Sequence, residues 1–352
     1  MELMILYITI AISILCVLLS LKKTDKSIDF LDIKSTGSFR GLAIIAIVFI
    51  HLLQNIGAPN WFLNIFLYCG CITVGIFFFI SGYANYQSLR KKDNVKGKWL
   101  YKKVFRLYLT FLFAYLINAI LLAVVNKEAF DIQTVLLELL SIKLHLWIIW
   151  YLKVQIAAYI ILWVSLKLFK MHNLKILWGI SLLYCIVFIL LKFNDFWWNS
   201  ILCFPLGVTI AKYKENITVF LKKINIFVAL APAFILSVIT YKIYMTGNNE
   251  IFGLISSILF CIFTVSFVFH FKIHSKILNF IGNISLEIYI WHLVFIDLYF
   301  KNALFIKNMN IMILIFFTSI IIFALATKKL INVIMNFVFK VNKSIEIPFL
   351  KK

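Results

Sequence analysis

The chain has 352 residues, of which 63% are hydrophobic and only 14% are charged. A soluble globular domain contains about 45–50% apolar residues, so this chain carries more apolar surface than a soluble fold can bury. The composition therefore excludes a soluble enzyme and predicts an integral membrane protein. In such a protein the formal net charge of +21 is a signal of membrane orientation, and we expect no nucleic-acid partner.

Apolar runs long enough to cross a bilayer recur along the whole chain. Only helices and closed barrels satisfy their backbone hydrogen bonds in lipid, and runs this long and continuous are typical of helices. The fold class that we predict is therefore all-α, a polytopic bundle of about 11 transmembrane helices. The runs are residues 3–21, 40–56, 62–86, 104–125, 146–169, 175–191, 196–211, 224–243, 250–270, 280–300 and 309–335.

The connections between these runs alternate in charge. Four lysines lie between residues 22 and 34, none between 57 and 60, and seven lysines or arginines between 90 and 103. By the positive-inside rule the N-terminus is expected outside the membrane and the C-terminus in the cytoplasm. The enrichment in Lys, Ile, Asn and Phe is typical of an AT-rich bacterial genome, so we expect a multi-pass protein of the bacterial cell membrane.

The six cysteines lie inside apolar runs and lack the spacing of a metal site. We therefore interpret them as small buried hydrophobic residues and expect neither a disulfide framework nor a bound metal. The acidic Glu2 precedes the run at 3–21 in place of a basic region, and no cleavage site follows the run, which favours a retained helix over a signal peptide.

Arg40 and His51 are the first candidates for chemistry. They are eleven residues apart in one apolar run, almost three helical turns, so they share a face and lie roughly 16 Å apart. An ionisable residue inside a membrane segment is costly, which makes a function the default hypothesis. The alternative is that His51 only packs against a neighbouring helix and that Arg40 is an ordinary anchor at the cytoplasmic surface.

A second polar stripe occupies the run at 280–300. Ser285, Tyr289 and His292 are four and three residues apart and so line one face of a helix. Glu287 and Asp297 are on other faces of the same run, and two acids in one span are not expected to face lipid. The alternative interpretation is a polar packing seam between two helices.

The connection at 90–103 leads into Lys102, Lys103 and Arg106, cations that could clamp a cytoplasmic polyphosphate. Such charges more often fix membrane topology and meet anionic lipids. Just before them, Ser81 and Gly82 allow a ligand contact or a close backbone approach, although helix packing through small residues is more common.

On the predicted outer side, aromatic residues gather at the start of the run at 146–169. Aromatic side chains at a membrane interface usually serve as anchors. Because sugar rings also stack on aromatic faces, a carbohydrate site is the alternative. The residues of this group are His145, Trp147, Trp150, Tyr151 and Lys153.

Together these motifs resemble the successive signatures of the membrane-bound acyltransferase 3 family, in order, across about residues 38–335. Members of that family move acyl groups, commonly acetyl from acetyl-CoA, onto hydroxyls of extracytoplasmic glycans. The motifs are Arg40-Gly-Leu-Ala with ten residues before His51, Phe-Phe-Phe-Ile-Ser-Gly-Tyr at 77–83, the basic run at 102–106, Leu-Trp-Ile-Ile-Trp-Tyr-Leu at 146–152 and Ile-Ser-Leu-Glu-Ile-Tyr-Ile-Trp-His at 284–292.

The resemblance implies a ten-helix acyltransferase domain at 38–335, preceded by an extra helix and its connection at 1–37 and followed by a basic cytoplasmic tail at 336–352. It implies roles for residues that match the motifs. Catalytic roles fall to His51, Arg40 and His292, and donor binding to Arg40, Ser81, Lys102, Lys103 and Arg106, while Trp147, Trp150, Tyr151, Tyr289 and Ser285 are the candidates for the acceptor.

One departure weakens the donor assignment. The family's basic motif usually begins with arginines and is followed by proline, whereas here lysines lead and Leu107 follows Arg106.

From these observations we predict an integral membrane O-acyltransferase that uses acetyl-CoA and modifies a bacterial cell-surface polysaccharide, such as a capsule or exopolysaccharide, or its lipid-linked precursor. The expected partners are the lipid bilayer, acyl-CoA and the glycan. The alternative is a transporter or exporter in which buried His, Glu and Asp side chains relay protons. A family member retained for assembly, without activity, is a third possibility. The acyl group, the acceptor hydroxyl and the oligomeric state stay open.

Overall fold

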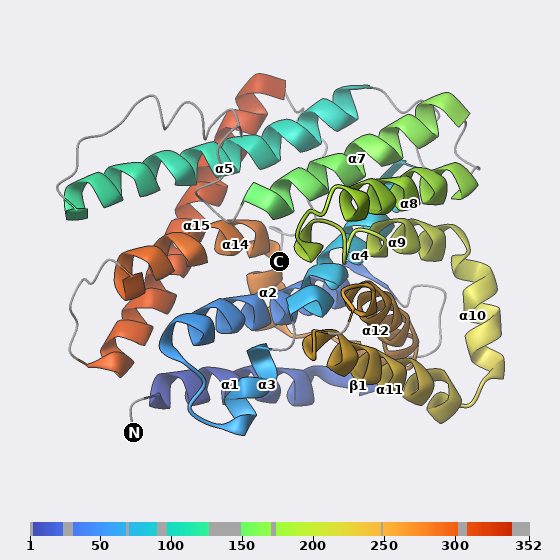
Figure 1. Ribbon diagram of the computed structural model, residues 1–352, viewed down its shortest axis with the longest axis horizontal. Coiled ribbons are helices and arrows are strands. Elements are labelled where there is room, and N and C mark those ends of the chain that lie inside the picture. The colour runs from blue at the N-terminus through green and yellow to red at the C-terminus, as the bar shows by residue number, and fades with distance from the viewer. Residues whose placement is uncertain are drawn as a thin grey trace.

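The structure of the chain is a computed structural model that describes residues 3–23, 31–67, 70–89, 97–126, 149–169, 174–247, 249–301 and 308–339. These residues form a helical bundle, which confirms the predicted all-α membrane fold (Figure 1). The helices are α1 (Met4–Ser20), α2 (Ile33–Ile56), α3 (Trp61–Leu67), α4 (Gly70–Leu89), α5 (Gly97–Asn126), α7 (Ile149–Phe169), α8 (Leu174–Leu190), α9 (Cys203–Lys212), α10 (Lys214–Lys223), α11 (Ile226–Met245), α12 (Ile251–His270), α13 (Lys276–Asn283), α14 (Ser285–Ile296) and α15 (Met309–Phe339).

Shorter elements join these helices. A 3₁₀ turn, η1 (Asp195–Trp197), precedes α9, and a π-helical segment, η2 (Asp297–Lys301), continues α14. Strand β1 (Leu21–Lys23) pairs antiparallel with β2 (Phe271–Ile273), which ties the end of α1 to the connection between α12 and α13.

Within the described residues, five helices are long and apolar enough to cross a membrane, namely α2, α5, α11, α12 and α15. Helices α13 and α14 form a further pair, bent by 73° at their junction. The predicted span at 196–211 contains only the ten-residue α9, which is about 15 Å long and too short to cross the hydrocarbon core alone. Each predicted run that the structure describes is helical, but the count of eleven stays a prediction.

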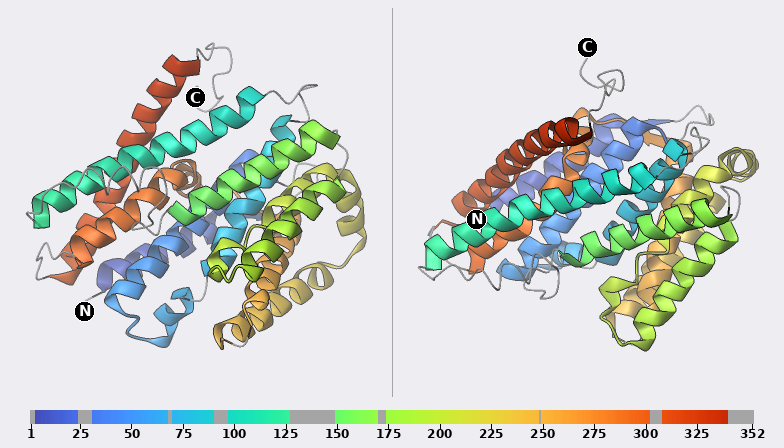
Figure 2. Two further views of the ribbon diagram at one scale, coloured as in Figure 1. Left: turned by 45° about the horizontal axis from the view of Figure 1, so that its top comes forward. Right: turned by 90° about the horizontal axis from the view of Figure 1, so that it is seen from above.

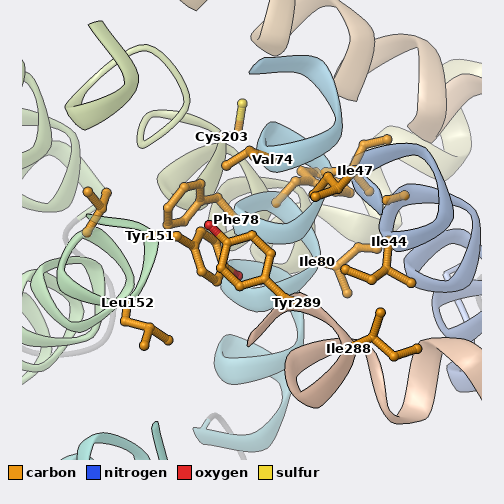
Figure 3. Packing of buried hydrophobic residues seen from close by; sticks show 14 of the residues in the cluster. Ile44, Ile47, Val74, Phe78, Ile80, Tyr151, Leu152, Cys203, Ile288 and Tyr289 are labelled. Atoms are coloured by element: carbon orange, nitrogen blue, oxygen red, sulfur yellow. The ribbon is translucent and has the colours of Figure 1, made fainter. Parts of the chain in front are cut away.

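The long helices run roughly alongside one another in both views of Figure 2. Helix α2 lies inside the bundle, where it packs on α3, α4, α13 and α14. Its apolar residues Ile44 and Ile47 meet Val74 and Ile80 of α4 and Ile288 of α14 (Figure 3). Burial of large apolar side chains from several helices fixes the position of α2 among its neighbours.

Glycines bring the backbones of α2 and α13 into direct contact. A Cβ atom on Gly41 would lie 2.0 Å from the carbonyl oxygen of Leu278, and one on Gly282 would lie 1.9 Å from that of Gly37. Gly37 and Gly41 are four residues apart, the small-residue spacing that lets membrane helices approach closely. The hydroxyl of Ser38 also donates to the carbonyl of Ser275, at 3.4 Å.

Helices α4 and α9 pack in the same way. A Cβ atom on Gly82 would lie 2.1 Å from the carbonyl oxygen of Phe204, and one on Gly207 would lie 2.0 Å from that of Phe79. Pro205 falls in the first turn of α9, where proline is tolerated, so it does not interrupt that helix. Gly82 therefore serves helix packing, which was the alternative interpretation of the Ser81-Gly82 pair.

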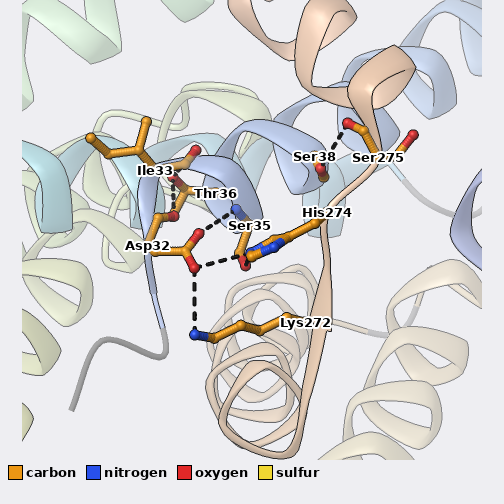
Figure 4. A network of polar contacts seen from close by, with 8 residues as sticks. All are labelled: Asp32, Ile33, Ser35, Thr36, Ser38, Lys272, His274 and Ser275. Carbon is orange, nitrogen blue, oxygen red and sulfur yellow. Dashed lines mark hydrogen bonds and ion pairs between the residues drawn. The ribbon is translucent and has the colours of Figure 1, made fainter. Parts of the chain in front are cut away.

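A polar network holds the start of α2 (Figure 4). Asp32 caps the helix by accepting a hydrogen bond of 2.7 Å from the backbone N–H of Ser35. Its second carboxylate oxygen lies 3.0 Å from His274 Nε2 and 3.5 Å from Lys272 Nζ. Burial alone would raise the pKa of Asp32, but the Ser35 N–H, His274 and Lys272 together hold that pKa below its usual value. The network ties α2 to the segment that follows α12.

The contact between α4 and α9 predicts the effect of adding one methyl group. Gly82→Ala places a Cβ atom inside the van der Waals radius of the Phe204 carbonyl, so we expect a loss of about 1–3 kcal/mol in stability. The matched control is Gly179→Ala in α8, where a Cβ atom meets no other atom within 4 Å and the better helix former adds about 1 kcal/mol. Thermal unfolding of the purified protein in detergent measures both, and equal melting temperatures for the two variants would contradict the packing described.

Candidate active site

A cavity of about 210 Å³ lies between α2, α4, α5, α7 and α14. It brings together side chains that are far apart in the sequence and that include six of the residues predicted from motifs. Its wall consists of Arg40, Phe77, Ile80, Ser81, Ala84, Asn85, Lys103, Leu107, Tyr151, Gln155, Tyr159, Ser285, Leu286 and Tyr289.

Cations gather at one end of this cavity. Arg40 of α2 and Lys103 of α5 both line it. Arg106, one turn further along α5, places its guanidinium 3.7 Å from the carboxylate of Glu287, a side chain that is only 2% exposed. Arg40 interacts electrostatically with the same carboxylate. This basic end of the cavity is suited to hold an anionic group by charge-assisted hydrogen bonds.

A network of uncharged polar groups forms the wall next to the basic end. Gln155 and Asn85 donate to the hydroxyl oxygen of Ser81 at 3.2 and 3.3 Å, and this hydroxyl donates to Tyr159 Oη at 3.3 Å. Tyr151 donates to the side-chain oxygen of Gln155 at 3.3 Å. Buried polar groups are stable only when they are paired, and this network pairs Gln155, which is 2% exposed.

Aromatic rings lead from the cavity to a pair of histidines. The ring centroid of Tyr151 lies 4.7 Å from that of Tyr289 (Figure 3), and the ring of Tyr289 lies 5.5 Å from that of His292. The rings of His292 and His51 are 5.2 Å apart and tilted by 32°. Helix α14 thus lies beside the face of α2 that carries Arg40 and His51, with Ser285 near the former and His292 near the latter.

Hydrogen bonds set the orientation of both imidazoles. His292 is fully buried, its Nδ1 lies 3.2 Å from the carbonyl oxygen of Ile288, and its Nε2 makes no hydrogen bond within the described residues. His51 is partly exposed, and its Nδ1 lies 3.0 Å from the side-chain oxygen of Gln54. Because both oxygens only accept, Nδ1 is the donor in each of these contacts, which leaves Nε2 as the nitrogen placed to exchange a proton.

The sequence model of the acyltransferase 3 family, described as an acyltransferase domain, matches residues 33–328. The chain belongs to this family. It is therefore a membrane acyltransferase. Comparison with curated proteins and with solved structures finds no match.

Three further predicted site residues of this acyltransferase, Arg106, His51 and His292, lie beside the cavity without lining it, whereas Lys102 and Trp150 make their contacts elsewhere. Lys102 places its ammonium group 5.3 Å from the ring of Phe339 in α15. Trp150 packs against Phe196, with ring centroids 5.3 Å apart, so it extends an aromatic cluster. The predicted Trp147 lies outside the described residues.

Sequence reasoning missed Gln155 and Tyr159, which line the cavity of the acyltransferase. Together with Tyr151 they are spaced four residues apart along α7. A polar stripe at this helical period in an otherwise apolar run was a usable signal for a lining face.

The Ser81 network predicts the effect of removing one hydroxyl. Ser81→Ala deprives the buried Gln155 amide of its acceptor, so we expect the acyltransferase to lose about 1–3 kcal/mol of stability. Ser165→Ala in α7 is the control, because Ser165 is also buried but bonds only to a carbonyl of its own helix, at 2.7 Å. Thermal unfolding compares the two, and a Ser81→Ala melting temperature at or above that of Ser165→Ala would exclude the network as a stabilising element.

Proposed function

We propose that this acyltransferase transfers acetyl from acetyl-CoA to a hydroxyl of a bacterial cell-surface polysaccharide, such as a capsule or exopolysaccharide, or of its lipid-linked precursor. The observation that carries the proposal is the cavity lined by Arg40 and Lys103, whose wall residue Tyr289 contacts the His51–His292 pair. An acyl donor with phosphates at one terminus and a thioester at the other matches this division.

The donor's phosphates are assigned to the basic end, where Arg40, Lys103 and Arg106 provide charge-assisted hydrogen-bond donors. Lys102 is omitted from this assignment because its ammonium group packs on Phe339. By the positive-inside argument this end faces the cytoplasm, where acetyl-CoA is available. Ser81 then contributes to the wall beside the donor, through its bonds to Gln155 and Tyr159.

The distance between the two ends matches a donor with a long arm. Arg40 and His51 are eleven residues apart on α2, which corresponds to roughly 16 Å along the helix axis. The extended pantetheine arm of CoA carries its thioester away from the nucleotide, so phosphates held near Arg40 leave the acyl group near Tyr289 and the histidines. The outer end of the route is then open to a glycan hydroxyl.

In the proposed reaction Nε2 of His51 accepts the proton of the acceptor hydroxyl while the hydroxyl oxygen attacks the thioester carbonyl carbon. The carbon–sulfur bond then breaks, and the leaving thiolate takes the proton back from the imidazolium to give free CoA and the ester. His51 is assigned as the base because it is partly exposed, whereas His292 is fully buried behind it. His292 orients the His51 ring, and Tyr289 or Ser285 is placed to donate to the developing oxyanion.

Membership of an acyltransferase family favours this enzyme over the alternative of a proton-coupled transporter. Direct attack on the thioester also needs no acyl-histidine intermediate, since a thioester is already activated.

The acceptor is expected to contact Tyr151 and the neighbouring aromatic residues, because sugar rings stack on aromatic faces.

Acetyl-CoA turnover by the purified protein in lipid nanodiscs tests the proposal. With water as the acceptor, free CoA thiol should appear slowly with the wild type, and His51→Ala should lower the rate about 10²–10⁴-fold because the general base is lost. Ser165→Ala is the control: its hydroxyl bonds to a carbonyl of its own helix, α7, so its turnover should stay within about twofold of the wild type. A wild-type rate in His51→Ala, or a wild type that leaves acetyl-CoA intact, would refute the proposed function.

A further inference from the structure

The buried carboxylate of Glu287, at the basic end, interacts with three cations from three different helices. Glu287 of α14 is only 2% exposed, and its nearest cation is Arg106 of α5 at 3.7 Å. Arg40 of α2 and Lys328 of α15 also interact electrostatically with this carboxylate. Three positive charges therefore share one negative charge, which leaves a formal excess of two positive charges in this cluster.

Lys328 was not among the residues predicted from motifs, and α15 contributes no other residue to the site. Its ammonium group donates a hydrogen bond to the backbone carbonyl of Asn283. Asn283 ends α13, where the chain turns by 73° into α14. The half-buried Lys328 is thus held at the entrance of α14, close to Glu287 and on the same side of the bundle as Arg40.

The internal partner does not neutralise this cluster. A bidentate arginine–carboxylate pair has N–O distances of about 2.7–2.9 Å, whereas Arg106 and Glu287 are 3.7 Å apart. Among the described residues one carboxylate balances only one of the three charges, and incompletely balanced buried charges are costly, so an anion that adds negative charge stabilises the cluster. An excess of two positive charges suits the two charges of a diphosphate group.

We propose that Lys328 is a further phosphate-binding residue of the donor site, and that the diphosphate of a nucleotide-bearing acyl thioester binds between Lys328, Arg106 and Arg40. Glu287 keeps the three cations together before the donor arrives. The inference rests on the proposed function, since it concerns the phosphates of the same donor. A purely structural role for Lys328, as a cap on α13, is the alternative.

Steady-state kinetics in nanodiscs separate these roles. Lys328→Met keeps most of the apolar stem and removes the charge, so the KM for acetyl-CoA should rise about tenfold, the value of one charge-assisted hydrogen bond, with kcat within about twofold. Lys328→Arg should restore the KM to within about threefold of the wild type. Lys329→Met is the matched control, because the neighbouring Lys329 is exposed and its replacement should leave the KM unchanged.

A second experiment uses acetyl-pantetheine, an acyl donor without phosphates. If Lys328 binds phosphate, wild type and Lys328→Met should use this donor with equal kcat/KM. An unchanged KM for acetyl-CoA in Lys328→Met, or an equal penalty with both donors, overturns the inference while the proposed function stands. If the wild type turns over neither donor, both the proposed function and the role of Lys328 are refuted. The wild-type rate therefore distinguishes failure of the proposed function from failure of the Lys328 inference alone.

Discussion

The close packing of α2 against α13 is the interaction on which the site depends, because α2 carries both Arg40 and His51. Gly41 and Gly282 allow backbone contact at this interface, and any side chain larger than hydrogen would separate the helices. The Asp32 network then fixes the first turn of α2 against the segment after α12. These contacts fix the rotation of α2 about its axis and its position along that axis. Both ionisable residues of α2 then face one neighbouring helix, α14.

Helix α14 supplies the complementary half of the site. Its break from α13, a bend of 73°, lets a short helix start beside Arg40 and continue toward His51. The first turn of α14 holds Glu287 among the cations, and its third turn places His292 against His51. Charges at one end and the histidine pair at the other thus lie along the same two adjacent helices, α2 and α14.

Much of this arrangement could be predicted from helical periodicity. The spacing of Arg40 and His51, and that of Ser285, Tyr289 and His292, each predicted one face of a helix, and the structure brings these two faces together. Helical periodicity does not determine which neighbouring helix a face will contact, so the contact between His51 and His292 could not be predicted from the sequence.

The basic run shows where sequence reasoning stops. Lys102, Lys103 and Arg106 are close in sequence, but each residue rotates by about 100° around a helix. Lys103 therefore lines the cavity while Lys102 turns to Phe339. Lys328 lay far outside every motif, and only the tertiary fold brings α15 to the charge cluster. The length of α9 was likewise hidden, because the apolar run around it continues through irregular turns.

We propose that the donor's phosphates bind at the basic end of the cavity and that its acyl group reaches the histidine pair beyond Tyr289. A cryo-electron microscopy structure in nanodiscs with acetonyl-CoA, in which a methylene group between sulfur and carbonyl prevents transfer, tests it most directly. We expect density for the diphosphate among Arg40, Arg106 and Lys328, and the carbonyl carbon next to His51. A nucleotide bound at the histidine end, or a donor bound outside this cavity, would contradict it.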